Sequence, residues 1–422
     1  MNMNHKSRRT VRSSLVSRKY AYASIITSLM LGLLALEVSI PSVSSEIDSI
    51  IVPDNYAKIQ WAIGNATPGA TIFIHNGTYY EHFIIDKPLT LIGETRKNTI
   101  VDGNRTGTVI KVSSNNVVIS ELTVRKSLRK TTTSHAGIAV SGHGCNITGN
   151  HLIDNKIGIF ADISQNNRIV ENTIVNNDHG ISLYHSSKVM VEANNLSKNT
   201  VGISLAYSSS NAIVKNRIAN SSTGGHGVTL LSDSFNNTVS NNHITNNYHG
   251  MWLSNSFNNS IIENLIANNE LLGVELADST RNTFYHNTFT NNPKHVKSDG
   301  QPNIWDNDYS SGGNYWSDYE NKYPSASRRG NSGMWNEPYI IEENNTDRYP
   351  LVNPYSENSI ISPDNENSTY QPWINTIAIV TVVTIAAAVL LWKYKTSKKT
   401  KRKKRTRKTH SNKTTKTANL PH

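Results

Sequence analysis

The chain has 422 residues, with 42 Lys and Arg against 31 Asp and Glu, so its formal net charge is +11. Six basic residues lie in the first twenty positions and thirteen in residues 393–422, and neither segment contains an acid. The rest of the chain therefore holds 23 basic and 31 acidic residues, a net charge of −8. This distribution argues against a nucleic-acid-binding domain, which needs Lys and Arg spread over a folded face. Cys145 is the only cysteine, which excludes an internal disulfide and a thiolate zinc site.

The amino-terminal segment has the features of a secretory signal. The basic first twenty residues precede an apolar stretch from Ala21 to Val38, and small residues follow it. This order predicts a signal peptide or a retained signal anchor over residues 1–45.

The carboxyl-terminal segment predicts a membrane anchor. Residues 356–372 lack periodicity and are predicted to form a stalk. Residues 373–392 enclose an uncharged apolar run between two Trp residues, long enough to form one transmembrane helix. The basic residues 393–422 follow at once, as in cytoplasmic tails after stop-transfer helices. We therefore predict a single-pass protein of the cell membrane, with an extracellular middle region and a cytoplasmic tail.

Ten Asn-x-Ser/Thr sequons lie in the predicted exterior part, although an Asn-rich chain also produces sequons by chance. They are compatible with N-glycosylation. The Asn residues are Asn65, Asn76, Asn104, Asn146, Asn195, Asn220, Asn236, Asn258, Asn344 and Asn367.

Residues 136–300 contain a repeat of about 22 residues. A marker Asn, followed two residues later by Ile, Leu or Phe, recurs at steps of 22, 22, 22, 26, 22 and 23, at Asn150, Asn172, Asn194, Asn216, Asn242, Asn264 and Asn287. A marker Gly begins a second series, Gly-(Ile/Val/Met)-x-(Leu/Val), in step with the first. The apolar residues alternate in short runs without helical spacing, which predicts short strands. Short strands at this period predict an all-β fold, a parallel β-helix of about ten coils.

Equivalent residues of successive coils in such a fold stack about 4.8 Å apart. Five residues before most marker Asn lies a second Asn, at Asn167, Asn211, Asn237, Asn259 and Asn282. Asn tolerates left-handed turn conformations, and stacked amides can hydrogen-bond along the axis, so we predict an Asn ladder at this corner. Cys145 holds the same place one coil earlier and is expected to be a small buried residue. The 26-residue step predicts a loop at residues 220–225.

Both ends of the stack need caps, because an open coil exposes sheet edges. Residues 46–135 are predicted to hold the amino-terminal cap and the first coils, with a short helix in which Tyr56, Ile59 and Ile63 share a face. Residues 301–355 are rich in aromatic side chains and are predicted to form the carboxyl-terminal cap.

Several segments resemble a known family. Residues 52–94, VPDNYAKIQWAIGNATPGATIFIHNGTYYEHFIIDKPLTLIGE, resemble the opening of right-handed parallel β-helix proteins with a pectin-lyase-like fold. The Asn-rich coils resemble NosD-type, carbohydrate-binding and sugar-hydrolase (CASH) repeats, and GGNYWSDY (residues 312–319) resembles the last block of archaeal cell-surface members. The resemblance implies a right-handed coil. It leaves function open, because relatives range from polysaccharide-cleaving enzymes to copper-maturation accessories and surface proteins. The same block continues with EPYIIEENNTDRYPL (residues 337–351), and relatives often carry acidic residues before its Pro-Tyr. Arg328, Arg329 and Asn336 stand there in this chain, which argues against an acidic calcium loop.

Catalytic carboxylates are sought first, because glycoside hydrolysis needs two of them about 5–9 Å apart. Glu171 and Glu263 share a repeat position but lie four coils apart, roughly 19 Å. Five other acids occupy unmatched positions, namely Asp162, Asp178, Asp233, Glu275 and Asp278. The catalytic residues therefore stay unknown, and a hydrolase or lyase is the second hypothesis for the function.

Outward positions of the coils suggest a binding surface instead. The position two residues after each marker Gly includes Phe160, Trp252 and Glu275, and the next outward position includes Tyr184. Rings beside small hydroxyl residues can stack on sugar faces, so these four are candidates for glycan binding, although exposed strand residues also look like this. The first hypothesis is a surface protein that binds extracellular or envelope polysaccharide without catalysis.

A third hypothesis is a copper-handling accessory. His226 and His249 occupy one repeat position on adjacent coils, and imidazole suits copper and zinc. Two ligands fall short of the three or four that tight sites use, so no metal or other cofactor is expected. The oligomeric state does not follow from the sequence.

Overall fold

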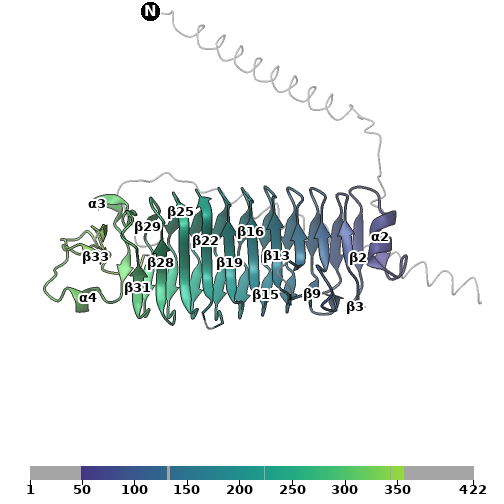
Figure 1. Cartoon of the computed structure of the whole chain (residues 1–422), viewed down its shortest axis with the longest axis horizontal. Coiled ribbons are helices and arrows are strands. Elements are labelled where there is room, and N and C mark those ends of the chain that lie inside the picture. Colours follow the sequence, from purple (N-terminus) through teal and green to yellow (C-terminus); the bar gives the residue numbers. More distant parts are fainter. Residues whose placement is uncertain (1–48, 131–133, 223, 343, 356–422) are drawn as a thin grey trace, which may run out of the picture. The chain divides into compact units, whose positions relative to one another are not determined.

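The computed structural model describes residues 49–130, 134–222, 224–342 and 344–355. These residues wind into three parallel sheets around one core, and each coil adds one strand to each sheet (Figure 1). The predicted right-handed parallel β-helix is confirmed, with sheets of 11, 10 and 11 strands, or about eleven coils rather than ten. The predicted segments 1–45, 356–372, 373–392 and 393–422 lie outside the described residues. None of the helices in the described part is long and apolar enough to span a membrane.

Sheet A has 11 strands, and its short strands follow the corner that carries the predicted Asn ladder. They are β1 (Ser49–Val52), β2 (Thr71–Ile74), β5 (Thr90–Gly93), β8 (Val118–Ser120), β11 (Asn146–Thr148), β14 (Arg168–Val170), β17 (Met190–Glu192), β20 (Ala212–Val214), β23 (Thr238–Ser240), β26 (Ser260–Ile262) and β29 (Thr283–Tyr285).

Sheet B also has 11 strands, and each follows a marker Asn in the repeat region. They are β3 (Gly77–Tyr79), β6 (Thr99–Asp102), β9 (Thr123–Arg125), β12 (His151–Ile153), β15 (Thr173–Val175), β18 (Asn195–Ser197), β21 (Arg217–Ala219), β24 (His243–Thr245), β27 (Leu265–Ala267), β30 (Thr288–Thr290) and β32 (Tyr315–Trp316).

Sheet C has ten strands. They are β4 (Phe83–Ile85), β7 (Ile110–Val112), β10 (Ala136–Val140), β13 (Ile157–Asp162), β16 (His179–Tyr184), β19 (Val201–Ala206), β22 (His226–Phe235), β25 (His249–Phe257), β28 (Leu272–Ala277) and β31 (Lys294–Lys297). Those from β10 to β28 contain the marker Gly. The marker Gly is needed because a Cβ on Gly202 would lie 2.5 Å from the carbonyl oxygen of Gly227 in the next coil.

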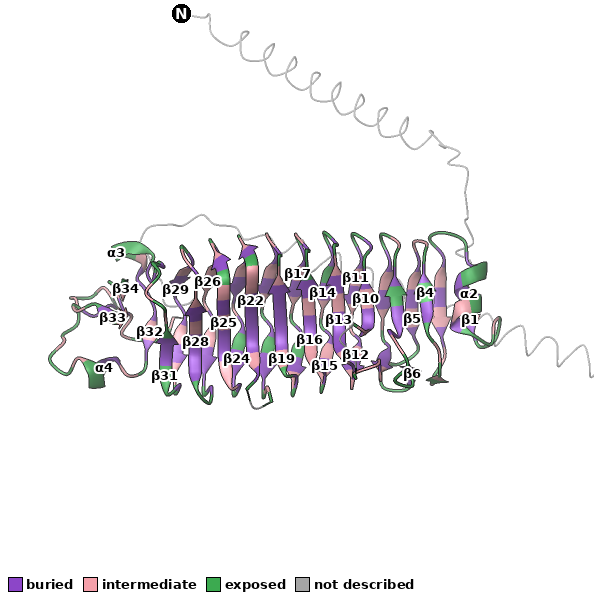
Figure 2. Ribbon diagram, in the orientation of Figure 1, coloured by how far each residue is buried: buried purple, intermediate pink, exposed green. Residues whose placement is uncertain are grey.

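The core is a set of stacked aliphatic residues, one from each strand. In sheet A, Ile169, Val191 and Ile213 pair in register and are at most 1% exposed. Figure 2 shows that buried positions recur along the successive strands of each sheet. The alternation read from the sequence therefore points the apolar residues inward, and the side chains between them face outward.

Buried Asn residues fill the corners between the sheets. Asn194 represents the marker series: its backbone N–H donates to Oδ1 of Asn216 at 2.9 Å, and its Nδ2 donates to the same oxygen at 3.0 Å. Its Nδ2 also donates to the carbonyl of Ile169 in the preceding coil, at 2.8 Å. The predicted ladder is confirmed too, and Cys145, 1% exposed, donates its N–H to Oδ1 of Asn167 at 2.8 Å.

A further ladder was not predicted. It lies five residues after the marker Asn, at Asn155, Asn177, Asn199, Asn247, Asn269 and Asn292. The ladder Asn residues do not themselves adopt the left-handed conformation that Asn tolerates. The residue before a ladder Asn carries the positive φ, as at Ala193 (54°) and Lys215 (57°), and the Asn itself satisfies the corner's peptide groups.

The 26-residue step is confirmed as an insertion, but in two places. Gly202 and Gly227 are 25 residues apart instead of 22, so three extra residues precede β22 near the predicted loop. The fourth forms a bulge, because the register between β22 and β25 shifts between Leu231 and Ser234.

Each end of the stack is covered. The helix α2 (Ile59–Asn65) buries Ile59 and Ile63 as predicted. Tyr56 was wrongly predicted to lie in this helix: it precedes the helix and packs against the core. At the other end lie α3 (Asp308–Ser311), α4 (Tyr319–Lys322), β33 (Tyr339–Glu342) and β34 (Asn345–Asp347).

The strand β34 ends two of the ladders. Asn345 accepts the N–H of Asn303, and Asp347 accepts the N–H of Asn314 at 2.7 Å and the indole N–H of Trp316 at 2.9 Å. Burial raises the pKa of Asp347 to about 7, although these donors oppose the shift.

We predict that Asn216→Ala lowers the free energy of unfolding by about 2 kcal/mol or more. It leaves two donors of Asn194 and the carbonyls of Val191 and Val214 without their partner, and a buried unsatisfied group costs about 1–3 kcal/mol. Urea unfolding followed by circular dichroism measures the loss. The exposed neighbour Asn195→Ala is the control and should stay within about 0.5 kcal/mol of wild type. Equal effects of the two substitutions would contradict the structural role of the ladder.

Candidate functional site

The outward side of sheet C brings three predicted residues into one row. Pairing of successive strands aligns Phe160 with Ser182, Ser204, Thr229, Trp252, Glu275 and Lys297 in that order. Tyr184 lies in the next row, where it pairs with Asp162 and Ala206. The four glycan-binding candidates therefore share one face of the coil.

Small hydroxyl side chains separate the two rings of this row. Phe160 and Trp252 are four coils apart, roughly 19 Å at the strand spacing. Between them lie Ser182, Ser204 and Thr229, and the Thr229 hydroxyl donates to Ser204 Oγ at 3.0 Å. These three hydroxyl residues form a polar strip between the aromatic rings, in which Ser182 is half-buried and Ser204 and Thr229 are buried.

Tyr184 belongs to an exposed aromatic cluster. Its ring lies 5.7 Å from that of Tyr207 and 4.5 Å from that of His185, and His185 stacks on Tyr207 at 4.7 Å. Tyr184 is 39% exposed and Tyr207 46% exposed. Tyr207 was not among the predicted residues, because the run Tyr207-Ser-Ser-Ser reads as a turn. The available signal was that both tyrosines lie at the end of a sheet C strand in consecutive coils.

A second ring cluster surrounds Trp252. Its indole stacks on His226 with ring centroids 5.1 Å apart, and His226 meets His249 at 5.0 Å, edge to face. Tyr248 stacks on His249 at 5.0 Å. Burial, with a smaller contribution from His249, lowers the pKa of His226 to about 4 against the opposing effect of Glu275.

Glu275 lies between a histidine and a lysine. Its carboxylate is 3.4 Å from Nδ1 of His249 and accepts a hydrogen bond from Lys297 Nζ at 2.7 Å. Nothing in the sequence indicated that a carboxylate lies beside His249. The side chain reaches across from the neighbouring row, a contact that repeat positions alone do not reveal.

We tested whether these residues fit a metal ion. Nδ1 of His226 and both ring nitrogens of His249 are buried and make no hydrogen bond in the described structure. Stacking on Trp252 and Tyr248 occupies the ring faces and leaves these nitrogens free. Among the residues described, however, no group of three His, Cys, Asp or Glu could hold a metal ion, so the pair supplies fewer ligands than the three or four of a tight copper or zinc site.

The other candidate carboxylates are dispersed. Asp178 forms an ion pair with Arg129, and Asp278 donates its backbone N–H to the side chain of Asp299. Glu171 and Glu263 hold left-handed positions at a corner, with φ of 57° each, and Asp233 lies in the bulge of β22. Asp162 pairs with Tyr184.

The predicted sequons are mostly accessible. Eight are exposed, at Asn65, Asn76, Asn104, Asn195, Asn220, Asn236, Asn258 and Asn344. Asn146 is half-buried in β11, and Asn367 lies outside the described residues.

Comparison with known proteins identifies the repeat. Residues 114–321 match the family model described as periplasmic copper-binding protein (NosD). No curated protein matches the chain in sequence.

Several solved structures are similar to the chain at low identity. Tailspike protein 2 of bacteriophage CBA120 (enzymatically active domain) is 11% identical over 58% of this chain and 43% of its own, with a TM-score of 0.48. The chain thus spans less than half of that structure. DFA-IIIase from Arthrobacter chlorophenolicus A6 is 15% identical over 60% of this chain and 84% of its own, with a TM-score of 0.45. The periplasmic alginate epimerase AlgG is 14% identical over 61% and 81%, with a TM-score of 0.36.

We predict that His226 makes the stability of the chain depend on pH. Its pKa falls from 6.5 to about 4 on folding, so between these values the unfolded chain binds more protons. The contribution of His226 to stability is therefore complete above pH 6.5 and lost as the pH falls toward 4. Unfolding in urea at several pH values should show a smaller pH slope for His226→Gln than for wild type. His243→Gln, at an exposed position on β24, should leave the slope unchanged, and equal slopes for all three proteins would refute the prediction.

Proposed function

We propose that this chain, which carries a NosD-type right-handed parallel β-helix, is a membrane-anchored cell-surface protein that binds extracellular or envelope glycans without cleaving them. The observation that carries the proposal is the outward face of sheet C, where the rings of Phe160, Tyr184 with Tyr207, and Trp252 are all at least partly exposed. Rings offer flat apolar surfaces to the sugar faces, and the half-buried Ser182 adds a hydroxyl that can exchange hydrogen bonds with a sugar hydroxyl.

The state of the carboxylates supports binding over catalysis. A general acid must hold a proton that it can deliver, and its partner carboxylate must lie within about 5–9 Å. Glu275, the one acid in the polar strip's row, is instead bound to Lys297, and its row neighbour on the other side is Trp252. Asp178 is paired with Arg129. Both are held as charged partners of cations.

Copper handling, which the name of the matching family suggests, receives no support from His226 and His249. Two imidazoles are fewer ligands than tight sites use, and no group of three His, Cys, Asp or Glu among the described residues could hold a metal ion.

We expect the purified full chain to bind selected oligosaccharides on a glycan array. Tyr184→Ala combined with Tyr207→Ala should weaken the strongest binder about fivefold or more, because each ring contact contributes about 0.5–1.5 kcal/mol. The matched control removes two exposed tyrosines elsewhere, Tyr80→Ala with Tyr309→Ala, and should leave the affinity unchanged. Absence of any bound glycan, or equal losses in the two double variants, would refute binding at this face.

The proposed topology has a separate test. Protease added to intact cells should digest residues 46–372 and spare a tag placed after His422, because the basic tail holds that end in the cytoplasm. Digestion of the tag together with the β-helix would place both on the same side and contradict a single-pass anchor.

A further inference from the structure

We propose that a basic hollow on the outer side of sheet B binds a sugar residue that carries an anionic group. The hollow has a volume of about 380 Å³ and is lined by Arg96, Lys97, Arg125 and His151, together with two threonines and two isoleucines. It belongs to the first coils, on a different sheet from the aromatic face, so the two proposals stand independently.

The fold builds the floor of this hollow from strand positions in register. Ile100 on β6, Thr123 on β9, His151 on β12 and Thr173 on β15 pair in sequence and form one outward row. Arg125 and Ile153 pair in the next outward row. Since these strand positions are fixed by the ladder of backbone hydrogen bonds, the floor of the hollow is preorganised.

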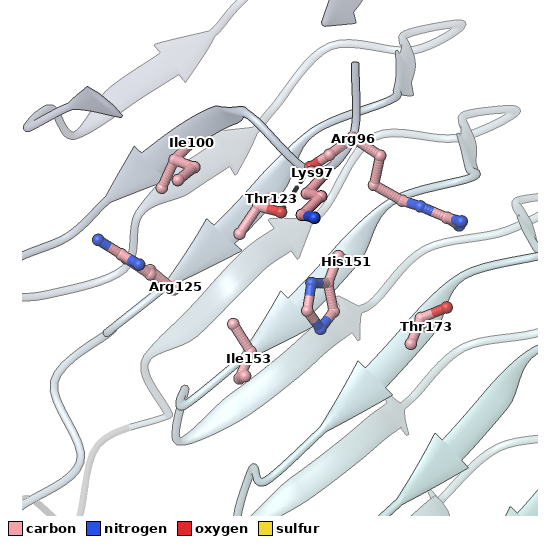
Figure 3. A pocket seen from close by; sticks show the side chains of 8 residues that line it. All are labelled: Arg96, Lys97, Ile100, Thr123, Arg125, His151, Ile153 and Thr173. Atoms are coloured by element: carbon pink, nitrogen blue, oxygen red, sulfur yellow. Dashed lines mark hydrogen bonds between the residues drawn. The ribbon is translucent and has the colours of Figure 1, made fainter. Parts of the chain in front are cut away.

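The positive charge comes from one turn and one strand. Arg96 and Lys97 lie in the turn between β5 and β6, and Figure 3 shows the Lys97 ammonium and the His151 ring near the middle, with the guanidinium groups of Arg96 and Arg125 on opposite sides. Arg125 donates to Asp102 at 2.7 Å, and Lys126 binds the same carboxylate at 2.9 Å. Neither Arg96 nor Lys97 forms an ion pair with a described residue, and none of the described lining residues is acidic. The charges of Arg96 and Lys97 are therefore left to attract an anion.

The pKa of His151 is affected by the positive charge in the hollow. Burial lowers the pKa of His151, the nearby Arg96 lowers it further, and Asp154 opposes both. An anion beside Arg96 would offset the positive field and favour the protonated imidazole, which could then donate a hydrogen bond to it.

The remaining surface fits a sugar better than a bare ion. Ile100 and Ile153 offer apolar contacts to a ring face, and the half-buried Thr173 offers a hydroxyl. Arginine and lysine bind carboxylate, sulfate and phosphate alike, so the shared chemistry is an anionic substituent on a saccharide.

Calorimetry on the purified full chain tests this with a matched pair of probes, a β-1,4-linked glucuronate trisaccharide and cellotriose, which differ in their carboxylates. Inorganic phosphate and inorganic sulfate are titrated in separate experiments. We expect the acidic trisaccharide to bind at least tenfold more tightly than cellotriose and than either inorganic anion. If the inorganic anions bind as tightly as the acidic trisaccharide, the proposal that the hollow recognises a sugar is overturned. If the two trisaccharides bind with equal affinity, the proposal that it recognises an anionic group is overturned.

Variants assign the binding to the hollow. Arg96→Gln with Lys97→Gln should weaken the acidic trisaccharide at least tenfold, whereas Lys188→Gln with Lys215→Gln, which removes two exposed charges at other corners, should change it less than twofold. Equal losses would show non-specific attraction and overturn the site.

As a second measure, binding near pH 6 should take up protons in wild type and not in His151→Gln, tested in two buffers of different ionisation enthalpy. Proton uptake unchanged by His151→Gln would remove His151 from the site. Retained binding in Arg96→Gln with Lys97→Gln, but loss in the Tyr184 and Tyr207 variant, would place acidic glycans on sheet C instead.

Discussion

The buried Asn amide at each corner is the interaction on which the rest of the structure depends. A coil that turns sharply three times leaves peptide groups at its corners unable to join the sheets, and burying them unpaired would cost free energy at every turn. One amide solves this for two coils, because its oxygen accepts from the preceding coil and its nitrogen donates to a carbonyl there. The residue before it then takes the left-handed conformation, at the surface, where its side chain is free to vary.

The same constraint creates the outer surface. Since the ladders hold successive coils in register, the side chains on one face form straight rows. A substitution at one outward position therefore changes the surface of a single coil. The strip on sheet C and the hollow on sheet B are both made in this way from ordinary strand residues. Their chemistry differs because Trp, Tyr and Ser occupy the rows in one place, and Thr, His and Arg in the other.

The fold could be predicted from the sequence because the repeat presents each position of the coil several times. The recurring marker Asn, marker Gly and aliphatic residues can therefore be told apart from the variable positions. The candidate site was only partly accessible. Phe160, Trp252 and Glu275 lie in one row as the repeat implies, yet the contacts of Tyr207 and the approach of Glu275 to His249 depend on corner geometry and on side-chain length. The hollow was missed because Arg96 and Lys97 lie in a turn before the regular repeats begin, where no period aligns them with His151.

The hydrogen bonds of the Asn ladder all run in one direction along the stack, and this limits how such a chain can change in length. The backbone N–H of each marker Asn donates to the amide oxygen of the marker Asn in the next coil toward the carboxyl-terminal cap. The series ends at Asp347, whose carboxylate accepts the last N–H, that of Asn314. Any whole coil offers the same groups to both neighbours, so a unit of 22 residues can be duplicated or deleted in the middle without disturbing either cap. Other insertions must leave the coil, as the extra residues before β22 and in its bulge do. The distance between surface features along the stack is thus adjustable in steps of one coil, about 4.8 Å, while the two caps stay the same.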